Sequence, residues 1–325
     1  MRKANNMKKI LATLTIMAAA GSVCAQDAQL SQLFNAPLLL NPAQTGLMDK
    51  AWRISGGYRN TTFSGGSNAF STGYISADTR WKMKGVQESD RLGVGLIGYL
   101  DQSSAGALRN NYIGLSLAFN KALTASGSTR LGVGAQALYV ARVLNTSKLV
   151  FEDQFGSGGF SSVPSRDASR GGSDQHLDLN VGLQLSHDAT AWGGSLGGAL
   201  RHVNRPKESF WSADYQLPMA YTVHGSAYAR LKGGDKLTFQ ALYVGFGEQN
   251  YLQGGLIFSK NIHLSTTETS LDLGVLGRDT RSIIPYLGLS YGNTRGAITY
   301  DVTTNSAKQG GLNRQSVELT LSHSF

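Results

Sequence analysis

The sequence predicts an all-β protein, a single transmembrane antiparallel β-barrel of about 14 strands. An N-terminal extension that lies in the periplasm or plugs the lumen precedes the barrel. Three observations predict this fold: an export signal at the front, apolar and polar residues that alternate with period two, and long connections that alternate with short ones.

The chain opens with a secretory signal peptide, residues 1–25. Lys8 and Lys9 form its positive start, Ile10 to Ala20 is its apolar run, and small residues precede a cut before Gln26. The apolar run is too short to cross a bilayer, and translation is expected to start at Met7. A lipoprotein signal that uses Cys24 is the alternative, which Val23 disfavours because a small residue is expected there.

Composition excludes several classes of protein. Cys24 is the single cysteine, so the mature chain has none and cannot be a small disulfide-stapled domain. The net charge of +9 includes four basic residues of the signal, which leaves about +5 without a Lys/Arg block, so nucleic acid is not an expected partner. Charged residues make up only 16% of the chain, below the usual value of about 25%, and no run of eighteen apolar residues follows the signal.

Alternation predicts the strands. In residues 177–186, Leu and Val interleave with Asp, Asn, Gly, Gln and Ser, so one face is apolar and the other polar. About fourteen such segments follow one another, near 51–60, 69–82, 91–101, 109–121, 130–142, 174–187, 191–202, 217–232, 235–246, 250–259, 262–276, 281–291, 295–303 and 315–325.

The eleventh segment, 262–276, breaks the pattern. Ile262 and Leu264 lie in one phase, whereas Leu271, Leu273 and Val275 lie in the other. Either a bulge changes the phase or a turn lies inside the segment.

Segment and connection lengths favour a membrane barrel over a secreted sandwich or propeller. About 9–11 residues cross a bilayer when tilted, whereas strands of soluble proteins average ~5–6. The long connections, 61–68, 143–173, 203–216 and 304–314, follow odd-numbered segments, and the short turns 188–190 and 233–234 follow even-numbered ones. Even-stranded barrels have this arrangement, with both termini in the periplasm and the loop of about 143–173 outside.

The last strand ends on Phe325, which resembles the C-terminal signature read by the barrel-assembly machinery. We therefore expect residues 51–325 to form the barrel in the outer membrane of a Gram-negative cell, surrounded by outer-membrane lipids.

The lead, residues 26–50, precedes the first strand. Asn41-Pro42 is a turn initiator, and Gly46 can adopt a backbone conformation that other residues avoid. The lead either caps the barrel floor or offers a contact surface to a periplasmic partner. With two residues of the long loop, its candidate partner-contact residues are Gln26, Asp27, Gln29, Ser31, Gln32, Asn41, Pro42, Gly46, Asp153 and Gln154.

Several motifs resemble, in order, those of the PorP/SprF family of outer-membrane proteins. The lead carries Gln-Asp-Ala-Gln-Leu-Ser-Gln from Gln26 and Asn-Pro-Ala-Gln-Thr-Gly from Asn41. Tyr58-Arg59-Asn60, the 151–155 segment, Leu276-Gly277-Arg278-Asp279 with Ile283-Ile284-Pro285, and Thr299-Tyr300-Asp301-Val302 follow. Thr61-Thr62-Phe63 departs from the family, which has Gln and Trp after Tyr-Arg. Tyr300, Asp301 and Phe325 are the expected structural or assembly residues.

The resemblance implies a non-enzymatic barrel of the type IX secretion system and gliding machinery. Such a barrel supports secretion or surface retention of specific adhesins with a C-terminal domain. It also contacts periplasmic or lipoprotein components of the machinery. The alternatives are a passive porin or hydrophobic-substrate transporter, and a surface adhesin that uses loops such as 143–173.

Two patterns of catalytic type carry little weight. Gly93-Val94-Gly95-Leu96-Ile97-Gly98 fits a dinucleotide fingerprint but lies inside a strand with no helix after it. The six histidines lack zinc-type spacing, and a His-Ser enzyme is the remaining alternative, because triads are assembled in space. We expect no catalytic residue, cofactor or metal.

Overall fold

The computed structural model describes residues 29–63, 68–81, 89–103, 106–156, 159–161, 163, 165–166, 172–210, 213–262, 267–279, 282–304 and 314–325. The predicted signal peptide, Gln26 and Asp27 lie outside these residues. None of the helices in the described part is long and apolar enough to cross a membrane.

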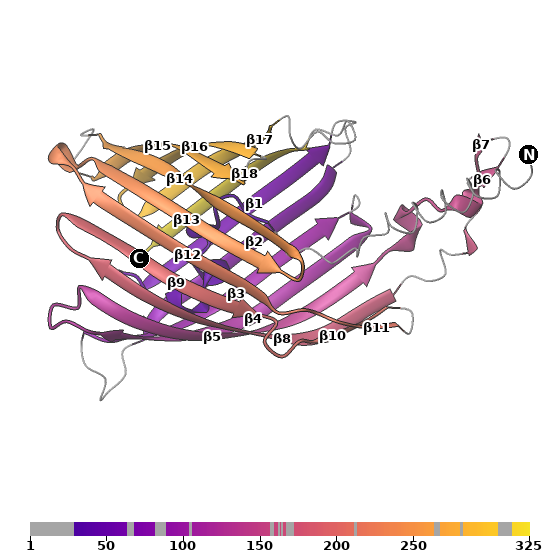
Figure 1. Cartoon of the computed structure of the whole chain (residues 1–325), viewed down its shortest axis with the longest axis horizontal. Helices are drawn as coiled ribbons and strands as arrows, with labels where there is room; N and C mark the ends of the chain where they lie inside the picture. Colours follow the sequence, from indigo (N-terminus) through magenta and orange to yellow (C-terminus); the bar gives the residue numbers. More distant parts are fainter. Residues whose placement is uncertain are drawn as a thin grey trace, which may run out of the picture.

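Fourteen strands close into one antiparallel barrel in which each pairs with its neighbours along the chain and the last pairs with the first (Figure 1). They are β1 (Trp52–Phe63), β2 (Asn68–Trp81), β3 (Arg91–Ser103), β4 (Leu108–Ala122), β5 (Thr129–Leu144), β8 (Gly172–Asp188), β9 (Trp192–Arg201), β12 (Ala220–Arg230), β13 (Lys236–Phe246), β14 (Gln249–Asn261), β15 (Thr269–Arg278), β16 (Ser282–Tyr291), β17 (Thr294–Thr303) and β18 (Arg314–Ser324). The predicted fold class is confirmed.

The eleventh predicted segment is wrong in its start. β14 continues to Asn261, which pairs with Ser270 of β15, and β15 begins at Thr269. The connection 262–268 lies between them. The two phases that conflicted therefore belong to a connection and a strand, and no bulge is needed to explain them.

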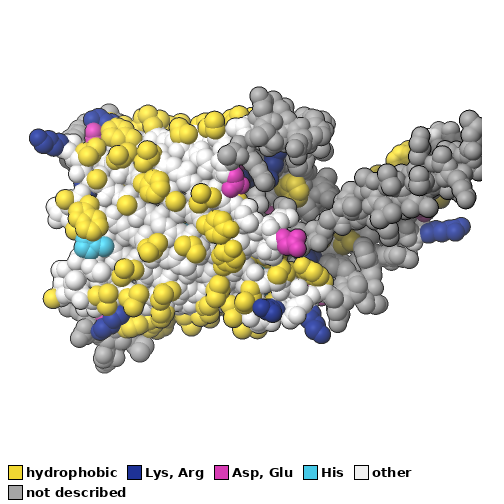
Figure 2. Space-filling view, viewed as in Figure 1, with side chains coloured by type: hydrophobic (Ala, Val, Ile, Leu, Met, Phe, Trp, Pro, Cys, Tyr) yellow, Lys and Arg dark blue, Asp and Glu magenta, His cyan; other side chains and the backbone are white. Residues whose placement is uncertain are grey.

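Alternation places apolar residues outside and polar residues inside. In β8, Leu177 and Leu183 are each 53% exposed, whereas Asp178 and Asn180 are 1% and 3% exposed. Figure 2 shows hydrophobic side chains spread over the outer wall. This is the pattern of a barrel whose outer face meets lipid.

The two ends of the barrel differ. At one end, called the turn end here, Trp52 of β1 meets Phe325, whose main-chain N–H donates to the Trp52 carbonyl at 2.9 Å. Exposed aromatic residues gather at the strand termini of this end, as in the girdles of membrane barrels: Trp52, Trp81, Trp192, Tyr291 and Phe325.

The opposite end, called the loop end here, carries the longest connections. Between β5 and β8, the two-stranded hairpin of β6 (Phe155–Gly156) and β7 (Gly159–Phe160) stands away from the barrel (Figure 1). A second hairpin, β10 (Lys207–Phe210) with β11 (Ala213–Gln216), lies between β9 and β12. Three of the predicted long connections, 145–171, 202–219 and 304–313 in the structure, lie at the loop end. The fourth, 61–68, is wrong, because β1 continues to Phe63 and β2 begins at Asn68, and the nine-residue connection 82–90 lies at the turn end.

The lead lies inside the barrel (Figure 1). It forms three short turns: η1 (Leu33–Asn35), α2 (Pro37–Leu40) and η2 (Pro42–Gln44). Of the two predicted locations of this segment, the periplasm and the lumen, the structure shows the lumen.

Candidate functional site

The lead is held by a network at the loop end of the lumen, called the front anchor: Ser31 and Gln32 with Arg59, Gln253, Arg278, Asp301 and Glu318. The Glu318 side chain binds the backbone of the lead. Its two carboxylate oxygens accept the N–H groups of Ser31 at 2.6 Å and Gln32 at 2.9 Å. Hydrogen bonds to an ionised acceptor are among the stronger ones, and Glu318 is fully buried.

The Ser31 hydroxyl joins the lead to the second carboxylate. It donates to Asp301 Oδ1 at 2.7 Å and accepts from Arg278 Nη2 at 2.9 Å. The Ser31 carbonyl accepts from Gln253 Nε2 at 2.8 Å. Every polar group of Ser31 is therefore bonded to the wall.

Two arginines neutralise the buried carboxylates. Arg59 lies 2.8 Å from Asp301 and 3.0 Å from Glu318, and Arg278 lies 3.2 Å from Asp301. All four charged side chains are at least about nine-tenths buried. Removal of one partner from such a set leaves an uncompensated buried charge, which is strongly destabilising.

Gln32 is recognised by its side chain. Its amide nitrogen donates to the Glu318 carbonyl at 2.9 Å and to Thr299 Oγ1 at 3.2 Å, while its oxygen accepts from Thr320 at 2.7 Å. The front anchor thus binds both the backbone and the side chains of the Ser31-Gln32 pair.

Apolar packing holds the middle of the lead. Leu38 packs with Ile97, Leu138 and Val140 of the wall, and each of the four is at most 3% exposed. Pro37 opens the short α2 helix that carries Leu38. Full burial of a leucine is worth about 1.5–3 kcal/mol, so this contact is a substantial part of docking.

At the other end of the lead, the rear anchor consists of Asn41, Pro42, Ala43, Thr45 and Gly46 against the wall. Asn41 begins η2 by accepting the Ala43 N–H at 2.9 Å. Its amide also donates to the carbonyls of Leu183 at 3.0 Å and Gly198 at 3.2 Å, and it lies 3.0 Å from His224 Nε2. The Asn-Pro turn is therefore bonded both to itself and to the barrel.

Inward-facing glycines make room for this turn. A Cβ at Gly182 would lie 1.9 Å from Asn41 Oδ1, one at Gly134 would lie 2.4 Å from Ala43 N, and one at Gly93 would lie 2.0 Å from the Thr45 carbonyl oxygen. Gly93 belongs to the apparent dinucleotide fingerprint. Its physical role is to let the lead approach the backbone of β3.

Gly46 ends the rear anchor with φ +67°, a left-handed conformation that favours glycine. Its N–H donates to Asp78 Oδ2 at 2.8 Å, and Asp78 pairs with Arg53 at 2.7 Å. The chain then enters β1 at the turn end. From Ser31 to Gly46 the lead consequently runs the length of the lumen, from loop end to turn end.

The structure brings six of the predicted residues together in the lumen. Ser31, Gln32, Asn41, Pro42 and Gly46 lie there, and Asp301 faces them from β17. Gln29 begins the described lead. Contact of the buried residues with another protein would require the lead to leave the lumen.

The other predicted residues lie elsewhere. Tyr300 is on the outer wall, 39% exposed, and Phe325 closes the barrel at the turn end. Asp153 and Gln154 order the long loop: Asp153 accepts the Arg166 N–H at 2.9 Å, and Gln154 donates to the Val163 carbonyl at 2.9 Å. Hydrogen bonds from Ser165 and then from the Arg166 backbone lower the pKa of Asp153 below 3.8.

Sequence reasoning missed most of the wall's contribution. Gln253, Arg278 and Glu318 were not predicted as site residues, nor were the glycines that receive the lead. A usable signal existed, because Arg278 and Glu318 are charged residues on the inward phase of membrane strands, where charge marks function. In the described part of the chain, no group of three or more His, Cys, Asp or Glu side chains could hold a metal ion.

Comparison with known proteins agrees with this architecture. The chain is similar in structure to the CymD monoaromatic hydrocarbon channel, at 13% identity and TM-score 0.52 over 90% of this chain and 93% of that one. It is also similar to a Pseudomonas aeruginosa FadL homologue, at 10% identity and TM-score 0.50 over 88% and 93%. Such low identities indicate a shared barrel fold alone.

The family is established by sequence. No curated protein matches the chain. A family model described as "Type IX secretion system membrane protein PorP/SprF" matches residues 22–323, nearly the whole chain. The chain therefore belongs to the PorP/SprF family of type IX secretion system membrane proteins.

Proposed function

We propose that this protein is a non-enzymatic outer-membrane barrel that supports secretion or surface retention of specific adhesin cargo and contacts periplasmic or lipoprotein components of the type IX machinery. The observation that carries the proposal is the lead fixed in the lumen at both ends. A passive porin needs a water-filled lumen, whereas here buried Leu38 and the front anchor occupy it.

The surface that we assign to cargo is the loop 145–171. It stands away from the barrel at the loop end, and Phe155 and Phe160 are 60% and 56% exposed with ring centroids 5.7 Å apart. Aromatic anchors among Gly and Ser are typical of binding loops. In this proposal Asp153 and Gln154 act by keeping the loop ordered.

The surface that we assign to the machinery is the rim where the lead enters β1. Asp49 and Lys50 are exposed there, and Arg91 pairs with Asp49 at 2.9 Å. By the even-strand rule this rim faces the periplasm.

A loop variant tests the proposal. Phe155 and Phe160 are both replaced by Ser in the chromosomal gene, with Phe239→Ser on the outer wall, where that side chain is 51% exposed, as a control. We expect the loop variant to assemble normally but to lose one or a few surface adhesins, as deletion of the whole gene does, while other type IX cargo is still exported. If gene deletion changes small-solute uptake and leaves every secreted protein unchanged, the protein is instead the porin or hydrophobic-substrate transporter.

A further inference from the structure

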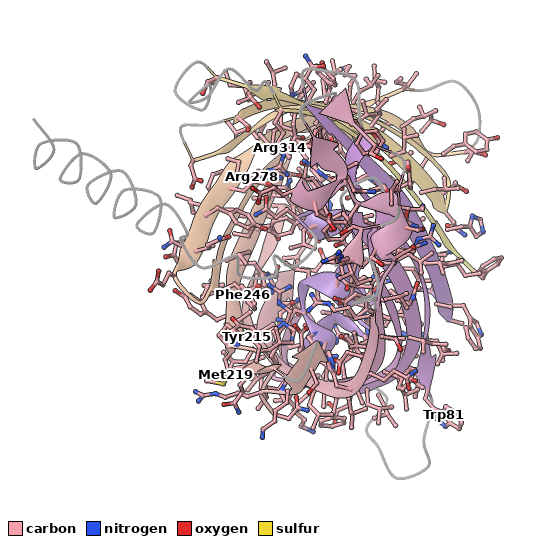
Figure 3. All side chains as sticks on the ribbon, turned by 90° about the vertical axis from the view of Figure 1, so that its right-hand side faces the viewer. Trp81, Tyr215, Met219, Phe246, Arg278 and Arg314 are labelled. Carbon is pink, nitrogen blue, oxygen red and sulfur yellow. The ribbon has the colours of Figure 1, made fainter. Side chains whose placement is uncertain are left out.

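Three arginines and two carboxylates lie together around the front anchor. Arg59 and Arg278 pair with Asp301, and Arg59 also pairs with Glu318, so that Arg314 beside them brings one positive charge more than the local carboxylates balance. Arg314 begins β18, and it is close enough to Arg59, Arg278 and Asp301 to interact with them electrostatically. Figure 3, which views the barrel from the loop end, shows Arg278 and Arg314 near one another inside it.

The hydrogen bonds of Arg59 and Arg314 are incomplete. Arg278 is bonded through all three of its guanidinium nitrogens, whereas the buried Arg59 Nε has no acceptor. Within the described residues, no hydrogen bond or ion pair involves the Arg314 guanidinium; the backbone carbonyl of this residue accepts from the Thr303 hydroxyl. The connections that flank Arg314 and its register partner Phe63, 304–313 and 64–67, contain no Asp or Glu.

We propose that Arg314, with Arg59 and Arg278 beside it, binds one carboxylate group at the loop end of the lumen. A guanidinium presents two parallel N–H donors that match a carboxylate, and a third negative charge would balance the three arginines. Ser31 and Gln32 are bound by Asp301, Glu318, Arg59 Nη1 and Arg278 Nη2, and none of their hydrogen bonds involves Arg314.

The carboxylate has two possible sources. One is Asp27, which lies outside the described residues, two positions before Gln29; two residues of chain span at most about 7 Å. The other is an acidic group of a separate polypeptide that reaches the loop end from outside. The chemistry of the site is the same in both cases, so an experiment must distinguish them.

Thermal unfolding of the purified full-length protein in detergent, with acetate replacing chloride at constant ionic strength, tests the site. Acetate is the carboxylate probe. If the source is external, acetate raises the unfolding temperature of the wild type by about 2 °C or more, because a ligand of the folded state stabilises it. If the source is Asp27, the wild type does not respond and Asp27→Asn does. Arg314→Gln abolishes the response in the first case, and Arg314→Gln combined with Asp27→Asn abolishes it in the second.

Two controls keep the result interpretable. Lys260→Gln removes an exposed positive charge, paired with Asp235 at the turn end, and should leave the acetate response intact. Arg314→Lys retains the charge and should respond weakly, which separates loss of the site from misfolding. The proposal is overturned if acetate shifts neither the wild type nor Asp27→Asn, or if it shifts Arg314→Gln equally, which would indicate an adventitious effect only.

Discussion

At the scale of single residues, buried polar groups of the lead form hydrogen bonds and ion pairs with residues that lie far away in the sequence. Glu318 binds Ser31 and Gln32 from the far end of the chain, and Arg59 lies between Glu318 and Asp301. Such a network is stable only when complete, because a half-satisfied set of buried charges costs more than an apolar core.

Glu318→Gln tests the front anchor. The amide cannot accept both lead N–H groups and leaves Arg59 without one of its two partners, so we expect a loss of about 3–5 kcal/mol in the free energy of unfolding. Urea unfolding in detergent measures it. Glu248→Gln, on an exposed turn, is the control and should change stability by less than about 0.5 kcal/mol.

Gly182→Ala tests the rear anchor. The added Cβ would overlap Asn41 Oδ1, so the Asn-Pro turn must shift, at a cost of about 1–3 kcal/mol. Gly198→Ala in β9 is a matched control, since its Cβ would lie 3.5 Å from the nearest atom, an ordinary contact. Equal stability of the two variants would show that the lead does not dock as described.

At the scale of elements, the strands form the barrel, and the connections between them form the surfaces that we propose as contacts for other proteins. In the described part of the loop 145–171 the regular elements are short, and side-chain hydrogen bonds of Asp153 and Gln154 join its segments. Because the pKa of Asp153 is lowered in the folded loop, its contribution is fully present above about pH 3.8 and is lost as the pH falls through the lowered value.

Asp153→Asn should therefore loosen the loop at neutral pH. The amide is a weaker acceptor for Ser165 and the Arg166 N–H, so trypsin should cleave after Arg166 faster than in the wild type. Glu152→Gln alters the neighbouring exposed carboxylate and is the control. Unchanged cleavage in Asp153→Asn would mean that other contacts order the loop.

The last strand closes the barrel, and Phe325 contributes through both backbone and side chain. Its carbonyl accepts the Ala51 N–H at 2.9 Å and its N–H donates to Trp52. Phe325→Ala keeps these bonds, whereas deletion of Phe325 removes them. We expect both changes to lower the amount of heat-modifiable barrel in outer-membrane fractions, the deletion more strongly. Normal amounts of both variants would exclude an assembly role for the terminal residue.

At the scale of the whole molecule, the barrel and its strands were predictable, whereas the docked lead was only partly so. Period-two alternation is local, so it is legible in segments such as 177–186. The contact between Ser31 and Asp301 joins residues 270 positions apart, and nothing in either neighbourhood specifies the other. Gly93 and Gly182 leave space for the lead, but a glycine in a strand can equally mark a bend. The neighbouring sequence does not distinguish the two roles.

The two halves of the site therefore differ in what the sequence could indicate. The residue pattern of the lead indicated a specific contact. Because the lead precedes the first strand, its location was limited to the periplasm or the lumen. Only the register of the closed barrel, in which Arg59 pairs with Glu318 across β1 and β18, brings the inward charges together at one level. That register depends on closure of the whole sheet.

The lead, anchored at both ends, is expected to close the lumen, and single-channel conductance in planar bilayers measures whether it does. The wild type is compared with a variant that lacks residues 26–40 but keeps the signal and the rear anchor. We expect little ionic current through the wild type and steady open-channel currents through the folded, heat-modifiable variant. A wild type that conducts as well as the variant would contradict this expectation.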